Sequence, residues 1–275
     1  MRKEFLLILI LILGINFQFF AQGDLLVTPN RVVFEGNKQK ESLNLVNMGK
    51  DTATYSISVV QKNMLEDGSF VTIEKPDSGQ MFADPYLRIF PRKVTLAPGE
   101  PQVIMLQCRR TPDMKDGEYR SHLYFRSEKD ISPLGLGKRL QDTTAISIEV
   151  IPIFGISIPV IIRTGAVVVE ATLSDLKLET QPGNIQNLKL TINRSGNISV
   201  YGNIKIEYVP VQGKPYQIGV VNGVGVYTNL KRRNISIKLD NQPGVILTQG
   251  KLKVQYISAG EGKPVIYSAT EMEIK

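Results

Sequence analysis

One stretch of the sequence, residues 146–163, constrains the fold of this chain more than any other. It reads ISIEVIPIFGISIPVIIR and is rich in Ile and Val. β-branched side chains are stiff at χ1 and favour strands, whereas the prolines and polar residues that interrupt the run do not suit a helix. We therefore expect one long extended strand.

Two prolines predict that this strand is not paired along both of its edges. Pro152 and Pro159 have no N–H group to donate, and prolines in sheets are confined to edges, strand starts or bulges. An apolar strand with an open edge is an aggregation hazard, and a protein that keeps one can use it to pair with another chain. The same edge would permit self-association.

The N-terminus predicts export. A basic start, MRKEF, is followed by the apolar run LLILILILGINFQFFA, which ends at a small residue, as in a secretory signal peptide. We expect residues 1–21 to be the signal, with cleavage after Ala21. Phe19 suits such a cleavage site poorly, and the run is slightly short for a membrane span, so an uncleaved anchor is the alternative.

The remainder of the chain has the pattern of an all-β protein. From residue 25 onward, short runs rich in Val, Ile, Thr and Tyr alternate with clusters of Gly, Pro, Asn and Asp. The length suits two domains, and a joint at Thr164-Gly165 separates two sets of strands. We expect β-sandwich domains over residues 22–163 and 164–275. Asn222-Gly223, in a glycine-rich run with no helix after it, is expected to form a hairpin turn.

Alternation within residues 86–127 predicts which side chains are buried. Cys108 shares one side of a strand with Ile104 and Leu106, so this single cysteine is expected to act as a small core residue. It cannot form an internal disulfide, and the apolar core must supply the stability. In the next strand, Tyr119, Leu123 and Phe125 face one way, while Arg120, His122, Tyr124 and Arg126 face the other, where we expect them to be exposed.

No arrangement of residues predicts a catalytic site. The sequence has no nucleophile motif, no Cys/His ligand spacing and no recognisable pair of carboxylates, and one histidine cannot build a histidine metal cluster. Asp113, Asp116 and Glu118 lack the EF-hand spacing for calcium, so we expect solvated acids in a turn. We expect neither enzymatic activity nor a metal or other cofactor.

The net charge does not indicate a nucleic-acid partner. The formal net charge is +7, which could favour anionic partners. The basic residues are scattered, however, and they lack the interleaved aromatic residues of a nucleic-acid surface. A solvated exterior is therefore the preferred interpretation.

Three features follow one another within residues 86–127: Pro91, the turn Pro98-Gly99-Glu100, and the strand GEYRSHLYF that begins at Gly117. Their order and spacing carry a resemblance to the PapD-like periplasmic chaperones of pilus assembly. It also includes Arg31 in TPNRVVF, followed by a glycine turn and the strand SLNLVN. It covers most of residues 25–163 and fades in the second domain.

The resemblance implies two immunoglobulin-like β-sandwich domains set at an angle with a cleft between them. It further implies a periplasmic chaperone that caps pilus or surface-structure subunits by donating the last strand of its first domain. Ile146, Ile148 and Val150 alternate along that strand and would fill the groove of the subunit. An outer-membrane assembly protein would be a further partner.

The family holds the C-terminal carboxylate of its client with two cations, an arginine on the first strand and a lysine on the last. Arg31 matches the arginine by its context, since a guanidinium can bind a carboxylate through two prongs. A plain strand arginine is the alternative. Residues 144–162 contain no Lys or Arg. Either Arg163 or a distant residue replaces the lysine, or the client is bound differently.

A second function from another class fits the same features. The chain could be a structural or adhesion-complex component of the cell surface that uses the sandwich to hold a permanent partner. The two hypotheses differ in whether the complex is transient.

Overall fold

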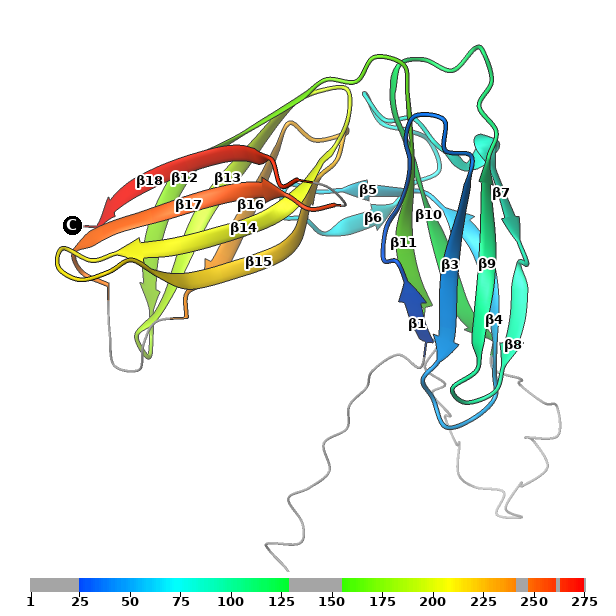
Figure 1. The fold of residues 1–275 in the computed structure, drawn as a ribbon, viewed down its shortest axis with the longest axis horizontal. Helices are drawn as coiled ribbons and strands as arrows, with labels where there is room; N and C mark the ends of the chain where they lie inside the picture. Colours follow the sequence, from blue (N-terminus) through cyan, green and yellow to red (C-terminus); the bar gives the residue numbers. More distant parts are fainter. Residues whose placement is uncertain (1–24, 129–154, 241–246, 261–262, 275) are drawn as a thin grey trace, which may run out of the picture.

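The computed structural model describes residues 25–128, 155–240, 247–260 and 263–274. These residues form two immunoglobulin-like β-sandwiches set at an angle to each other, as Figure 1 shows, with one 3-10 turn, η1 (Asp84–Tyr86). The prediction of an all-β chain with two sandwiches is confirmed. Within the described residues, no helix has the length and hydrophobicity needed to cross a membrane. The predicted signal and the strand residues Ile146, Ile148 and Val150 lie outside the described residues.

The first sandwich packs a four-stranded sheet on a five-stranded sheet. The four-stranded sheet has the order β1 (Leu25–Thr28), β3 (Lys40–Asn47), β9 (Pro101–Cys108) and β7 (Leu87–Phe90). The five-stranded sheet has the order β2 (Val32–Phe34), β11 (Gly155–Thr164), β10 (Gly117–Glu128), β4 (Ala53–Val60) and β8 (Lys93–Leu96). Every second side chain is buried from Leu43 to Asn47 in β3 and from Ile104 to Cys108 in β9, as period-2 alternation predicts, and Cys108 belongs to this core.

Two prolines mark the points where the chain changes sheets. β1 lies in one sheet and β2 in the other, with Pro29 between them, and β7 and β8 are divided in the same way by Pro91. Both prolines follow cis peptide bonds. A proline cannot continue a ladder, so each crossing ends one pairing and begins another. Arg31 lies directly before β2, at the first of these crossings.

β11 contains the described part of the apolar stretch 146–163. It pairs with β10 along its whole length, from Gly155 to Thr164. On its other edge it pairs with β2, in parallel, only at Val160, Ile161 and Ile162. Among the described strands, none pairs with that edge over residues 155–159. The expected strand is thus present over this part, and part of one edge is without a partner among the described residues.

The second sandwich is built from a three-stranded and a four-stranded sheet. The first has the order β12 (Val169–Gln181), β13 (Ile185–Gly196) and β16 (Arg232–Lys238). The second has the order β15 (Tyr216–Val226), β14 (Val200–Val209), β17 (Gly250–Ser258) and β18 (Ile266–Ile274). Leu188, Ile204 and Tyr256 are fully buried in the core between them.

The prediction of a hairpin turn at Asn222-Gly223 is wrong. Both residues lie inside β15, where its register with β14 shifts and only Asn203 lies opposite them. Gly223 has a φ of 71°, and its N–H donates to Asn203 Oδ1 at 3.0 Å. A glycine with positive φ suits a β-bulge as well as a turn, so the dipeptide alone could not distinguish the two.

A small hairpin of the first sandwich makes contacts with the second sandwich. It consists of β5 (Lys62–Met64) and β6 (Phe70–Thr72), and Figure 1 shows it extending from the first sandwich towards the second. Met64 packs with Ile161 of β11 and Tyr227 in an apolar cluster separate from the two cores. Glu66, in the hairpin turn, pairs with Arg232 at 2.9 Å. The interface between the sandwiches therefore has an apolar part and a polar part.

Two substitutions on neighbouring strands are expected to lower the free energy of unfolding by different amounts. Leu45→Ala on β3 removes a side chain that is 0% exposed and leaves a cavity, so we expect a loss of about 2–5 kcal/mol in the free energy of unfolding. Val103→Ala on β9 alters a side chain that is 44% exposed, and we expect a change within about 0.5 kcal/mol. Urea unfolding followed by circular dichroism measures both, and equal losses would contradict this account of the core.

Candidate functional site

The candidate site lies at the interface, on the face of β10 and β11 that points away from the first core. Tyr119, Leu123 and Phe125 of β10 are in that core, so the predicted division of β10 into two faces is confirmed. The opposite face carries Glu118, Arg120 and His122. All three are buried, since the second sandwich and the β5–β6 hairpin cover them. The prediction that this face is exposed is therefore wrong at these positions.

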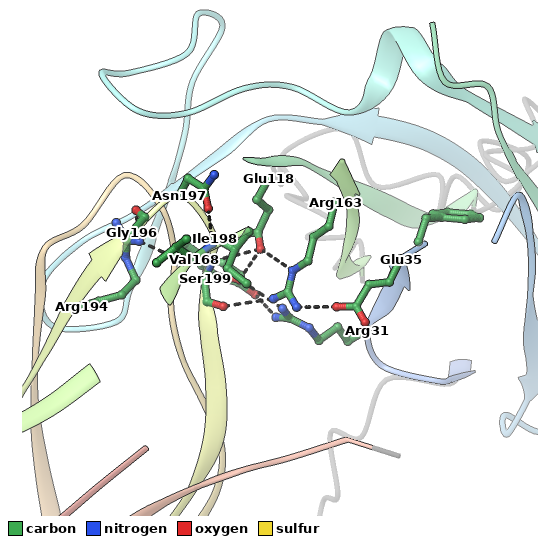
Figure 2. A network of polar contacts seen from close by, with 12 residues as sticks. Arg31, Glu35, Glu118, Arg163, Val168, Arg194, Gly196, Asn197, Ile198 and Ser199 are labelled. Carbon is green, nitrogen blue, oxygen red and sulfur yellow. Dashed lines mark hydrogen bonds and ion pairs between the residues drawn. The ribbon is translucent and has the colours of Figure 1, made fainter. Parts of the chain in front are cut away.

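Glu118 connects the two sandwiches through its side chain and its backbone, as Figure 2 shows. Its Oε2 accepts hydrogen bonds from Ser199 N–H at 3.0 Å, Ser199 Oγ at 2.7 Å and Arg163 Nε at 3.1 Å. Its backbone N–H donates to Asn197 O at 3.1 Å. The side chain is 0% exposed, so Glu118 is not the solvated acid that its position near a turn predicted.

Arg163, on β11, uses its guanidinium for contacts with both sandwiches. It lies opposite Glu118 in the register of β10 and β11, and it also pairs with Glu35. Its Nη2 donates to Ser199 O at 3.0 Å, so one guanidinium contacts groups from both sandwiches. Arg163 was one candidate for the second cation of the family. The structure places it between two carboxylates, which together exceed its single positive charge.

Arg31 lies at the same interface but contacts only neutral groups among the described residues. Its Nη2 donates to Ser199 Oγ at 3.3 Å, and its Nη1 donates to Tyr227 OH at 3.5 Å. The guanidinium carbon lies 4.5 Å from the ring centre of Tyr201 and 5.7 Å from that of Tyr227. Such cation–π contacts orient a cation without neutralising it. Arg31 is thus half-buried, well positioned, and without an acidic partner in the described structure.

Arg120 is a residue of this site that sequence reasoning missed. It is 1% exposed, and its guanidinium carbon lies 3.8 Å from the ring centre of Tyr227. Its Nη2 donates to Lys62 O at 3.1 Å and to Asn229 Oδ1 at 3.3 Å. The sequence did carry one signal, because Arg120 stands two residues after Glu118 and must share its face. Tyr227 and Ser199 had no comparable signal, since they come from the second sandwich.

His122 is buried, which corrects the expectation that it is exposed. It is 3% exposed and packs against Phe70 of the hairpin, with ring centres 5.6 Å apart, and against Tyr227. Burial lowers the pKa of His122 to about 3, and the positive charges of Arg120, Lys62 and Arg31 contribute to the shift. The imidazole is therefore neutral near pH 7. The hairpin that covers it is distant in sequence, so strand alternation could not predict its burial.

Cys108 and the acidic residues do not add a reactive group to the site. Cys108 is 2% exposed in the first core, and burial raises the pKa of its thiol. This placement matches the prediction of a small core residue. Within the residues that the structure describes, no three His, Cys, Asp or Glu side chains come together in a group that could hold a metal ion.

The buried position of Glu118 predicts a large effect of removing its charge. In Glu118→Gln, Arg163 keeps Glu35 but loses its buried partner, so we expect the free energy of unfolding to fall by about 3 kcal/mol. Glu66→Gln is the matched control, because its pair with Arg232 crosses the same interface in solvent and should contribute little. Similar unfolding curves for Glu118→Gln and wild type would contradict a structural role for this ion pair.

The depressed pKa of His122 predicts a loss of stability at acidic pH. The unfolded chain binds a proton below about pH 6.5 that folded His122 does not bind until about pH 3, so stability falls as the pH falls through this window. One such group contributes a slope of up to about 1.4 kcal/mol per pH unit. In His122→Gln this contribution disappears, and no other histidine replaces it. Parallel pH profiles of the two proteins in urea unfolding would contradict the assignment.

Several solved chaperone structures are similar to this chain. The YadV chaperone has a TM-score of 0.46 at 12% identity, covering 92% of this chain and 100% of that chain. A complex of CsuC with the tip subunit CsuE, from archaic chaperone-usher pili of Acinetobacter baumannii, has a TM-score of 0.42 at 14% identity, covering 92% and 98%. The SafB chaperone with the SafA pilin, from Salmonella enterica, has a TM-score of 0.41 at 14% identity, covering 90% and 96%.

No protein-family model and no curated protein sequence matches the chain.

Proposed function

We propose that this protein is a periplasmic molecular chaperone that binds pilus or surface-structure subunits and caps them by donating a β-strand. The observation that carries the proposal is the edge of β11. Over residues 155–159 this edge has no partner among the described strands, although the strand is apolar and borders the interface. An incoming strand would satisfy its free backbone groups.

The register at this edge supports a direction for the incoming strand. β2 runs parallel to β11 and pairs Val32 with Val160. A strand added along residues 155–159 in the same direction would be collinear with β2 and would end next to Arg31, which directly precedes it. A chain that ends there would bring its terminal carboxylate to the guanidinium. This geometry supports Arg31 as the anchor of the client carboxylate.

The groove-filling residues are proposed from the sequence upstream of β11. Ile146, Ile148 and Val150 have the same even-numbered positions as Ile158 and Val160, which point into the first core. In a strand that continues without a bulge, they would extend this apolar face beyond the sandwich and fill a matching groove in the client. The predicted N-terminal signal supports a periplasmic location, where exported subunits pass.

Two variants test strand donation. Each is isolated from its native periplasm, and the amount of client that co-purifies with it is measured. Ile148→Asp would place a charge in an apolar groove, and Arg31→Ala would remove the carboxylate anchor. We expect each to reduce the yield of co-purified client at least tenfold, which corresponds to about 1.4 kcal/mol. Val103→Asp and Arg88→Ala, on the opposite sheet of the same sandwich, are the controls and should retain the client.

The results distinguish an assembly chaperone from a structural component of the cell surface. Unchanged client yield in both variants would exclude strand donation. A client that reaches the cell surface without this protein supports a chaperone. If this protein instead remains in the surface assembly, it is a structural component and the chaperone proposal fails.

A further inference from the structure

The outer face of the four-stranded sheet of the first sandwich exposes apolar side chains at neighbouring positions. This face points away from the second sandwich, because the five-stranded sheet lies between them (Figure 1). Phe90 on β7 is 76% exposed, and its partner in the register, Met105 on β9, is 46% exposed. The apolar surface continues across β9, β3 and β1. We call it the outer patch, and it consists of Leu26, Val46, Phe90, Pro101, Val103 and Met105.

The outer patch ends at a group of basic residues. Lys40 of β3 and Arg88 of β7 flank the same position of β9, in the row next to the one that holds Phe90 and Met105. Arg92 follows β7 directly after the proline that ends it. These three cations line a hollow with a volume of about 280 Å³, together with Phe90 and Met105. Apolar and positively charged groups therefore meet at one place on this face.

The three cations have no counter-charge in the part of the chain that the structure describes. Lys40, Arg88 and Arg92 are exposed, and none of them pairs with a carboxylate of a described residue. Arg88 Nη1 donates to the carbonyl group of Leu87 at 3.0 Å. The outward positions of β1, β3, β9 and β7 hold no Asp or Glu. The face is therefore complementary to a partner that is apolar and negatively charged.

A lipid surface fits this face better than a polypeptide does. The backbone groups inside the sheet are already paired with neighbouring strands, so a polypeptide laid on the face could bind only through side chains. Over the outer patch its own N–H and C=O groups would lose water without gaining a hydrogen bond, which is costly. Acyl chains have no such groups, and the phosphate groups above them are attracted to Lys and Arg.

We propose that the outer patch and the three cations beside it form a docking surface for a membrane that contains anionic phospholipids. Phe90 and Met105 enter the apolar boundary below the headgroups, and Lys40, Arg88 and Arg92 contact the phosphate groups. This inference goes beyond strand donation and does not depend on it, because the edge of β11 belongs to the other sheet. A protein docked in this way keeps that edge directed away from the lipid.

A single tryptophan can report contact with lipid, because the sequence contains none. Phe90→Trp is taken from the soluble periplasmic extract, which leaves behind any chain held by an uncleaved anchor. With vesicles of equal parts phosphatidylcholine and phosphatidylglycerol, we expect its emission to move to shorter wavelength, because the indole leaves water. Phosphatidylcholine alone should give no shift. Val211→Trp is the matched control, since Val211 is 72% exposed in the second sandwich, and its emission should not change.

Cosedimentation with the same vesicles measures what each group contributes. Phe90→Ser should weaken binding at least about tenfold, because the ring no longer leaves water for an apolar environment. Lys40→Gln and Arg92→Gln should each weaken binding about fivefold, and added salt should weaken the binding of wild type. Lys214→Gln removes an exposed cation of the second sandwich and should bind like wild type. Equal melting temperatures would confirm that all these surface variants are folded.

Several results would overturn the inference. If wild type does not bind the mixed vesicles, or binds without a shift in the emission of Phe90→Trp, the outer patch is not the contact surface. Equal binding to phosphatidylcholine alone, or unchanged binding of Lys40→Gln and Arg92→Gln, would exclude the cations. If Phe90→Trp responds to polyglutamate and not to vesicles, the face binds an acidic polypeptide and lipid is the wrong partner.

Discussion

The arrangement of the two sandwiches depends on one buried carboxylate. Glu118 accepts hydrogen bonds from a side chain of its own sandwich and from the backbone and side chain of Ser199 in the other. A buried ion pair is costly to form, and good geometry and further hydrogen bonds offset that cost. In Glu118, Oε2 accepts three hydrogen bonds, whereas Oε1 is buried without a partner among the described residues. Here the pair requires Arg163, near the end of β11, to meet Ser199, which directly precedes β14. Only a limited set of angles between the sandwiches allows this meeting.

Apolar contacts and the hairpin complete the same interface. Met64, Ile161 and Tyr227 pack together away from both cores, and the hairpin covers the face of β10 that carries Arg120 and His122. Because this cover excludes water, charges beneath it interact more strongly than they would at the surface. This cover lowers the pKa of His122, and it also keeps water from the Arg120 donors that have no partner among the described residues.

Sequence reasoning succeeded where structure is local and failed where it depends on distant contacts. Alternation placed Cys108 in the core and divided β10 into two faces, because the two-residue period is a property of any half-buried strand. It could not show that Glu118, Arg120 and His122 are buried on the second face. That face is covered by a hairpin and by a second sandwich, and their docking leaves no periodic signal. The bulge at Asn222-Gly223 was mistaken for a turn because both can place a glycine in the positive-φ region, as Gly223 is here.

The point where β2 begins limits how far an added strand could extend along the edge of β11. β2 occupies the edge of β11 from Val160 onward, so a strand added before it meets a stop at Arg31. Strand register is ordinarily set by side-chain pattern, and a slip of one residue turns every side chain to the other face. A stop at the end of the edge sets the register from the terminus of the added chain instead. Under the proposed strand donation, the edge would therefore align added chains by their C-terminal ends, whatever their sequences, because each chain would stop at Arg31.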